Sequence, residues 1–354
     1  MAFTAFASGD PQAVKRWSQM LMRETFGKMD IRSLIGRGEG ACIQLKTELD
    51  REAGDEIKYD LLAQDRTDGV DGDAKLEGFE TELTFFNDSL KINQKRKAHS
   101  FKKMSQQRTV HSLRESGRFS LAEWWGWFIE AGIFAHLTGV AGNGNESVAG
   151  ALRATSAGDL DFAGNALTAL DANHLVDNGA GACDLGMIDD AVAKAKVYNP
   201  RVVPLVINGQ KRFVIYLHPL QIRSIRSATG AGTWNEIHQR ASAAGKDNPI
   251  YTGAQGEYNG CIIRESEFIP SVGNVRHGIL LGAGAACIGF GNAWDKDTRS
   301  SAGNGTFFNW KERLSDFDNE RGVAGISTLG LKGTKFNNLA FGRIGIRSTD
   351  AAPS

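Results

Sequence analysis

The hydrophobic positions near the start of the chain recur with helical spacing. Pro11 opens a pattern in which Val14, Trp17 and Leu21 fall on one face, and the pattern stops near Gly27. Proline favours the first turn of a helix, and this spacing is that of an amphipathic helix. A short amphipathic helical arm is therefore predicted.

A second helical segment is apolar on nearly every side. Ser120 and Glu123 have the spacing of a capping box that opens the run LAEWWGWFIEAGIFAHL, and the run stops at Thr138 and Gly139. A helix with apolar residues all round cannot lie on a surface with one face in water. We expect this helix to be packed on most of its sides.

Three further helices are predicted in the second half of the chain. The first carries Leu185, Ile188, Val192 and Ala195 on one face, and the second starts at Pro219 and carries Ile222 and Ile225. The third begins at a capping box of Thr233 and Glu236 and ends at Gly245.

Alternating apolar residues predict strands elsewhere. Between 41 and 87 the runs IQLKTEL, IKYDLLA and ELTFF are separated by turns such as DGVDGD, which predicts a long β-hairpin with an excursion at its tip. Later strands are VVPLVI and FVIYLH around Asn208 and Gly209, then GCIIRES, GILLGAGAACIGFG, GISTLGLKG and FGRIGIRS. The fold class is α+β, with helices among antiparallel strands. The Gly/Ala-rich segment 141–182 is expected to be an exposed loop or a flexible hairpin.

Composition narrows the class of protein. The 354 residues exceed the size at which one hydrophobic core stops growing, so two lobes or one elaborated domain are expected. Forty-one basic residues balance forty-one acidic ones, which disfavours binding to nucleic acid or an anionic membrane. No signal peptide or membrane span is evident, and the four cysteines are scattered as in a reduced cytosolic chain.

Charge is distributed unevenly along the chain. Residues 91–118 hold nine basic residues and one acid, directly after an acidic stretch that contains DRTDGVDGD. The basic strip lacks the interleaved aromatic residues of single-strand nucleic-acid binders. Pairing with an acidic neighbouring subunit is the favoured interpretation, with phosphate binding as the alternative.

Candidate chemistry is sparse. The GxSxG, Walker A, GxGxxG and HExxH motifs are absent, and His218 is interpreted as structural. Calcium binding by the acidic run is disfavoured because Val70 stands where an EF-hand loop starting at Asp68 needs an oxygen ligand. The crowded tryptophans of the long helix favour a core or interface over a ligand cage. No catalytic, metal or cofactor-binding residue is assigned, and no cofactor is expected.

Several motifs resemble one family of tailed-phage major capsid proteins. They are GDEIKYDL at 54–61, GVDGDAKLEGFE at 69–80, INQKRKAH at 92–99, FVIYLHPLQ at 213–221, GEYNGCIIRESEFIP at 256–270, ILLGAGAACIGFG at 279–291 and FGRIGIR at 341–347. They occur in the same order and span nearly the whole chain. The resemblance implies the Hong Kong 97 capsid fold and a structural subunit that is not an enzyme.

The resemblance also implies a division of the chain. Residues 1–40 would be an N-terminal arm, 41–97 the extended loop, 98–140 the peripheral domain with the spine helix, 141–315 the axial domain and 316–354 a return to the peripheral domain. The implied function is self-assembly as hexamers and pentamers into an icosahedral head around double-stranded DNA, bound without sequence specificity. The implied location is the virion, assembled in the host cytoplasm.

The expected partners are other copies of the chain, with portal, separate scaffolding and decoration proteins, and no membrane. A subunit contact is hypothesised in which acidic residues of one copy approach basic residues of the next. The residues are Asp65, Asp68, Asp71, Asp73 and Glu77, and Arg96, Lys102 and Lys103. The alternatives are a decoration, portal-adjacent or tail-tube subunit, and an enzyme with dispersed carboxylates.

Overall fold

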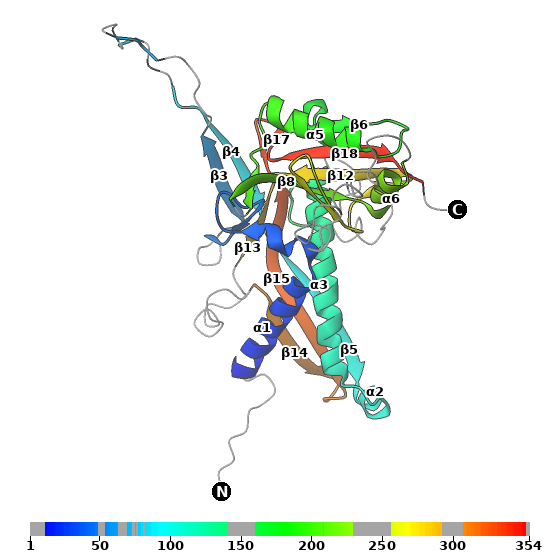
Figure 1. Ribbon diagram of the computed structural model, residues 1–354. Helices are drawn as coiled ribbons and strands as arrows, with labels where there is room; N and C mark the ends of the chain where they lie inside the picture. Colours follow the sequence, from blue (N-terminus) through cyan, green and yellow to red (C-terminus); the bar gives the residue numbers. More distant parts are fainter. Residues whose placement is uncertain are drawn as a thin grey trace.

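The computed structural model describes residues 11–48, 54–62, 69–72, 75, 77–78, 80, 82–140, 160–207, 209–228, 256–291 and 307–351. Figure 1 shows an elongated lower part, in which helix α3 runs beside long strands, and an upper part built on a second sheet. The predicted helix at Thr233 lies outside the described residues.

The long helix α3 spans Leu113–Thr138 and begins earlier than predicted. Its N-cap is Ser112, whose hydroxyl accepts a hydrogen bond from the backbone N–H of Glu115 at 3.4 Å, so the predicted cap at Ser120 is wrong. Two SxxE pairs follow each other, Ser112 with Glu115 and Ser120 with Glu123. The helix starts at the earlier pair, which was missed because the turns after it are polar. The predicted end is confirmed, because Gly139 caps the helix at a φ of +71°.

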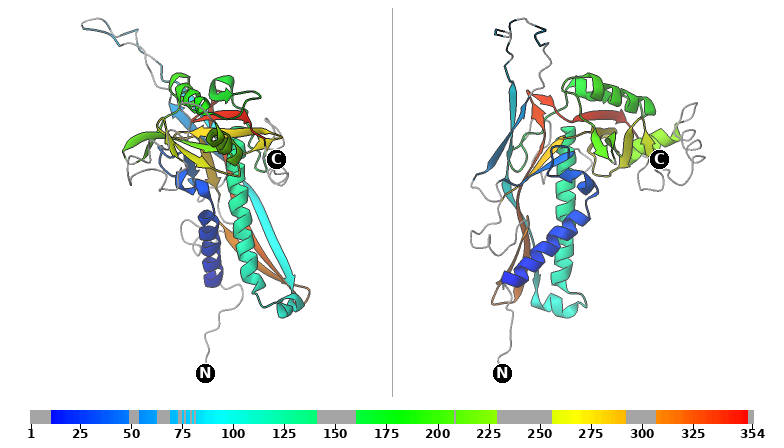
Figure 2. Two further views of the ribbon diagram at one scale, coloured as in Figure 1. Left: turned by 45° about the vertical axis from the view of Figure 1, so that its right-hand side comes forward. Right: turned by 60° about the vertical axis from the view of Figure 1, so that its left-hand side comes forward.

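Helix α3 is packed on most sides, as its apolar run predicted. Helix α1 (Pro11–Gly27) lies across it, as the right-hand view of Figure 2 shows. Trp17 of α1 stacks on Trp310 with ring centroids 5.5 Å apart, and Ser18 Oγ accepts the Trp310 backbone N–H at 2.9 Å. The helical arm is therefore part of the core.

A six-stranded sheet covers the other side of α3. Its order is β1 (Ile35–Gly36), β2 (Ile43–Lys46), β13 (Ala286–Phe290), β15 (Glu320–Gly333) and β14 (Asn309–Ser315), and β5 (Asn93–Lys102) also pairs with β15. Gly325 of β15 allows a close approach of helix and sheet, since a Cβ there would lie 2.9 Å from Trp125 Nε1. The apolar helix thus buries one side on a strand that is itself paired on both edges.

An eight-stranded sheet forms the upper part. Its members are β6 (Leu175–Asp177), β18 (Arg343–Thr349), β12 (Val275–Leu281), β8 (Gln210–Leu217), β10 (Cys261–Glu265) and β9 (Gly256–Tyr258), with β11 (Ser271–Val272) and β7 (Leu205–Ile207) beside them. Helices α5 (Leu185–Val197) and α6 (Pro219–Ser227) confirm two predicted helices. The β7–β8 hairpin confirms the predicted turn position.

The sheets are mixed, although antiparallel strands were predicted. The pairs β1–β2, β2–β13, β8–β10 and β6–β18 are parallel. Continuously apolar strands such as β13 are buried on both faces, and strand direction is not encoded in such a run. The α+β class holds.

The predicted hairpin is real but shorter than expected. Strand β3 (Glu56–Leu62) pairs antiparallel with β4 (Phe85–Lys91), and the two extend away from the body in Figure 1. Strand β2 does not belong to this hairpin, contrary to the prediction, because Ile43 is fully buried in the main core and β2 pairs with β13. Two small strands, β16 (Lys335–Phe336) and β17 (Leu339–Ala340), flank its base.

Part of the predicted 141–182 loop is structured. Residues 141–159 lie outside the described residues, but a 3-10 turn, η3 (Ala172–His174), precedes β6, and Leu167 is fully buried. The expectation of an exposed loop is wrong for 160–182. Asp161 and Asn165, read as loop-forming, are buried and hydrogen-bonded instead.

The two sheets do not follow the segment boundaries implied by the resemblance. Strands β13 and β14 precede residue 316 yet pair with β15, whereas β18 follows it and lies in the eight-stranded sheet. The remaining elements are η1 (Asp30–Leu34), which follows α1, and α2 (Lys103–Arg108), which connects β5 to α3.

Candidate interaction surfaces

The root of the hairpin is held to the body by a buried charge. The Asp88 carboxylate of β4 accepts the Tyr59 hydroxyl at 2.9 Å and the Lys335 backbone N–H at 3.2 Å, and it forms an ion pair with Lys332. The side chains of Lys332 and Asp88 are 12% and 6% exposed. Hydrogen bonds to a shielded charge are among the stronger ones, so this contact fixes the root on β15.

Apolar side chains at the same root lie over glycines of the sheet. Leu90 is fully buried, and a Cβ on Gly289 would lie 2.8 Å from its Cδ2. A Cβ on Gly330 would lie only 2.0 Å from the Lys91 carbonyl oxygen. The hairpin can cross β13 and β15 this closely because no side chain intervenes.

The segment after residue 160 also holds the hairpin. The Asn165 side chain accepts the Lys91 backbone N–H and donates to the Lys91 carbonyl, each at 2.8 Å. Asp161 in turn accepts the Asn165 backbone N–H at 2.7 Å and lies 3.1 Å from His136 Nε2 near the end of α3. A continuous polar network therefore joins the hairpin root to the long helix.

Apolar side chains farther along the hairpin are not covered. Leu62, Leu83 and Phe85 are 51%, 67% and 61% exposed. A second exposed group lies at the far end of the long sheet, on and beside α2 and the β14–β15 turn: Met104, Val110, Phe119, Leu314 and Phe317. Clustered exposed apolar residues mark surfaces that contact other molecules.

The residues of the hypothesised charge contact are not brought together within one chain. Asp65, Asp68 and Asp73 lie outside the described residues. Asp71 and Glu77 are exposed, and Glu77 pairs with Lys75 at 2.6 Å.

Their basic counterparts lie on the long sheet and its end. Arg96 and Lys103 are exposed, and Lys102 lies 3.7 Å from Glu320 of its own chain. The pairing was hypothesised between copies, so it stays a prediction.

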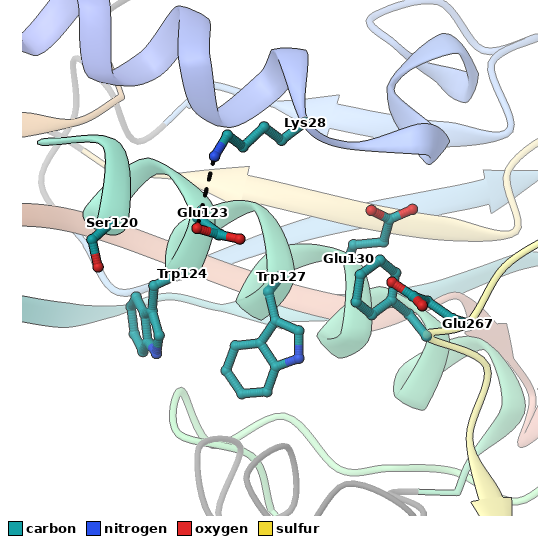
Figure 3. A pocket seen from close by; sticks show the side chains of 8 residues that line it. Lys28, Ser120, Glu123, Trp124, Trp127, Glu130 and Glu267 are labelled. Atoms are coloured by element: carbon teal, nitrogen blue, oxygen red, sulfur yellow. Dashed lines mark ion pairs between the residues drawn. The ribbon is translucent and has the colours of Figure 1, made fainter. Parts of the chain in front are cut away.

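Sequence reasoning missed a pocket of about 600 Å³ beside α3. Figure 3 shows the indoles of Trp124 and Trp127 projecting from the helix, with Lys28 near Glu123. The whole lining is Lys28, Ser120, Glu123, Trp124, Trp127, Glu130, Glu267 and Phe268. The tryptophans were assigned to core or interface, and Trp125 is fully buried, but its two neighbours are only partly buried.

Glu130 is the unusual charge of this pocket. The residue is 1% exposed, and its carboxylate accepts the backbone N–H groups of Asp30 at 3.4 Å and Ile31 at 3.3 Å. Burial, and then the nearby Asp30 carboxylate, raise its pKa to about 7, and Glu267 acts in the same direction. Among the described residues, no cation forms an ion pair with this group.

The cysteines and His218 have structural roles. All four cysteines are free and buried, and burial raises the thiol pKa of Cys183 and Cys261 to about 12. His218 caps α6 by accepting the Leu220 backbone N–H at 3.1 Å, and burial lowers its pKa to about 4. Within the described ranges, no cluster of three possible metal ligands occurs, and no helix is long and apolar enough to cross a membrane.

Comparison with known proteins gives consistent relatives. A family model described as phage capsid protein matches residues 5–352. The chain is 26% identical to a major capsid protein of Pseudomonas phage KPP25 over 369 residues, which covers 95% of this chain and 93% of that one.

Solved structures agree with these relatives. The chain is similar to the capsid of Ralstonia phage GP4, with a TM-score of 0.77, 28% identity and 100% of both chains covered. The capsid asymmetric unit of cyanophage Pam1 matches with a TM-score of 0.71 at 17% identity, over 91% of this chain and 92% of that one, which concerns the fold alone.

Proposed function

Because this chain belongs to the phage capsid protein family, we propose that its copies assemble as hexamers and pentamers into an icosahedral head that encloses double-stranded DNA. It is a major capsid protein with the Hong Kong 97 capsid fold, a structural protein of the virion and not an enzyme. Many copies form the capsid shell.

The hairpin is the observation that carries the proposed assembly. Its root is fixed by Asp88 and Leu90, while Leu62, Leu83 and Phe85 stay exposed in the single chain. A two-stranded hairpin is marginal alone in water, so its distal part is stabilised by contact with another subunit. An arm fixed at one end and apolar beyond it suits a closed shell of interlocked copies.

The family resemblance supports a segment assignment in which residues 1–40 are the N-terminal arm, 41–97 the extended loop, 98–140 the peripheral domain with its spine helix, 141–315 the axial domain and 316–354 the return. Helix α1 and strands β2, β13, β14 and β18 each pack on or pair with elements that this assignment gives to another segment. The partners are portal, scaffolding and decoration proteins. Assembly takes place in the host cytoplasm, and the DNA is held without sequence-specific contacts.

Imaging of the particles formed by the purified full-length chain, with and without a separately supplied scaffolding protein, tests this function. Closed shells with five-fold and six-fold capsomers are expected. Helical tubes would instead indicate a tail-tube subunit. Single copies that bind only to preformed shells would indicate a decoration protein.

The proposed charge contact pairs the acidic set Asp65, Asp68, Asp71, Asp73 and Glu77 with the basic set Arg96, Lys102 and Lys103 of the next copy. Arg96 is the best position to test, because it is exposed and Lys102 already has Glu320 nearby. Arg96→Glu should lower the assembly yield, and added salt should lower the wild-type yield as it screens the contact.

Lys311→Glu, an equal charge change at an exposed position of β14, is the matched control. Equal yields for both variants, together with a wild-type yield that ignores salt, would rule out the charge contact.

A further inference from the structure

The pocket beside α3 combines negative charge with aromatic surface. Glu123, Glu130 and Glu267 supply three carboxylates, and Lys28 is the single cation of the lining. Lys28 Nζ lies 4.0 Å from the Glu123 carboxylate, and the two side chains are 43% and 76% exposed. On the Glu130 and Glu267 side of the pocket, away from Lys28 and Glu123 in Figure 3, the lining therefore holds two carboxyl groups and no cation.

The aromatic wall has one available ring. Trp124 stacks on Phe128, with centroids 5.2 Å apart, and Lys97 of β5 lies 5.4 Å from the Trp124 ring. The ring centroids of Trp127 and Trp124 are 6.4 Å apart. No cation of the described part of the chain lies over the Trp127 ring. An indole face beside carboxylates is a favourable environment for an ammonium or guanidinium group.

The arrangement does not suit a metal ion. The carboxylates lie around the wall of the pocket, and the described residues hold no cluster of three possible metal ligands. An elongated cation with an apolar stem can contact the indole along its length and a carboxylate at its end. A lysine or arginine side chain has this shape.

From the geometry we infer that the pocket formed by Trp127, Glu130 and Glu267 receives a lysine or arginine side chain from a second copy of this chain. The inference rests on the proposed function, since a shell brings copies into contact. The basic segment 91–118 offers a donor that the proposed charge contact does not use: Arg108 is exposed and forms no ion pair among the described residues.

The electrostatics of Glu130 support the inference. Its carboxylate accepts hydrogen bonds from the η1 backbone and lies near Asp30 of η1, Glu267 of the segment after β10 and Tyr216 of β8, and Glu123 and Lys28 line the same pocket. Burial and the acidic neighbours raise its pKa to about 7 in the single chain. A cation that enters the pocket would stabilise the ionised form and bring that pKa down, so assembly should become weaker as the pH falls below about 7.

Imaging of wild-type shells at side-chain detail tests the inference. A lysine or arginine of a neighbouring copy against Trp127, within hydrogen-bonding distance of Glu130 or Glu267, is the expected result. An empty pocket, an apolar side chain or a segment of the same chain there would overturn it. Closed shells with an empty pocket leave the proposed function intact, whereas failure to form any multimer overturns both.

A substitution separates this contact from a structural role. Glu267 is exposed, so Glu267→Gln should leave the unfolding midpoint of the unassembled chain unchanged. The same variant should raise the protein concentration needed for assembly roughly fivefold or more, as expected for loss of a charged hydrogen bond. Glu130→Gln should act alike and also remove the dependence of assembly on pH near 7.

Asp190→Asn, which removes an exposed carboxylate of α5, is the matched control and should assemble as the wild type does. An unchanged assembly threshold in both glutamate variants would overturn the inference.

Discussion

Asn165 and Lys91 form two hydrogen bonds of 2.8 Å, in which the side-chain amide of Asn165 accepts the backbone N–H of Lys91 and donates to its carbonyl oxygen. The contact spans 74 positions of sequence and joins the segment after residue 160 to the root of the extended hairpin. An amide that pairs with a peptide in this way continues the hydrogen bonding of a strand at its edge. The hairpin is thereby fixed at a point where its own two strands end.

Asn165→Ala should lower the free energy of unfolding of the unassembled chain by about 2 to 3 kcal/mol. The reason is that the partly buried N–H and C=O of Lys91 lose their partners, and the buried Asn165 side chain is removed. Urea unfolding followed by tryptophan fluorescence measures the change. Asn93→Ala is the control, because it removes two hydrogen bonds at exposed sites, one of 3.0 Å to the Phe162 carbonyl and one of 2.7 Å from the Gln94 backbone N–H, and it should cost less than about 1 kcal/mol. Equal losses for both variants would contradict this account.

Gly330→Ala should destabilise the chain by more than about 3 kcal/mol, because the added Cβ would lie 2.0 Å from the Lys91 carbonyl oxygen. Gly322→Ala on the same strand provides the control. The nearest atom to a Cβ there is 3.8 Å away, so that variant should be neutral or slightly more stable. Thermal unfolding compares them, and similar midpoints for the two variants would show that the hairpin root can move away.

These contacts mark the limit of what the sequence could predict. The apolar run of α3, the β7–β8 turn and the glycine at the end of α3 are local signals, and all three are confirmed. The start at Ser112 was missed because a second SxxE pair follows it at Ser120. Local patterns do not say which strands pair, so β2 was placed in the hairpin although it pairs with β13.

The interaction surfaces were harder to predict from the sequence than the helices and turns. The acidic character of Asp88 was visible, but its buried partner Lys332 is 244 positions away. In the sequence, Glu130 is an ordinary polar position of an apolar helix. Its burial depends on η1 and on the segment of Glu267, which are distant in sequence and fold over it. A helical register that leaves a glutamate on a buried face was the one available signal.

Glu130 should make the stability of the unassembled chain fall as pH rises from about 4.5 to 7. Its pKa is raised from 4.5 to about 7, so in this window the folded chain binds a proton that the unfolded chain has released. The expected loss is about 2 kcal/mol. Glu130→Gln should abolish this slope, and Glu123→Gln, at an exposed position of the same pocket, should keep it.

Two histidines give the unfolding free energy a pH dependence opposite to that of Glu130, and their contribution must be subtracted from the wild-type curve. Burial lowers the pKa of His218 and His277 to about 4, so protonation of the unfolded chain reduces stability as pH falls from 6.5 toward 4. The test is therefore the difference between wild-type and variant unfolding free energies at each pH. A difference that does not change between pH 4.5 and 7 would show that Glu130 is not perturbed.

Phe85→Ser should separate assembly from folding. Phe85 begins β4, is 61% exposed and lies beyond the root that Asp88 and Leu90 fix, so its loss should change the unfolding free energy of the unassembled chain by less than about 0.5 kcal/mol. Shell formation should be strongly reduced, because an apolar side chain buried against a neighbour contributes about 1.5 to 3 kcal/mol at every copy of the contact.

Leu90→Ser reverses this pattern and is the comparison. Leu90 is fully buried at the hairpin root, so the variant should lose about 3 kcal/mol of folding stability before any assembly step. Light scattering measures assembly, and urea unfolding measures stability on the same samples. Normal shell yield from Phe85→Ser would mean that the distal hairpin is not buried between subunits, and that its exposed side chains remain in solvent in the particle.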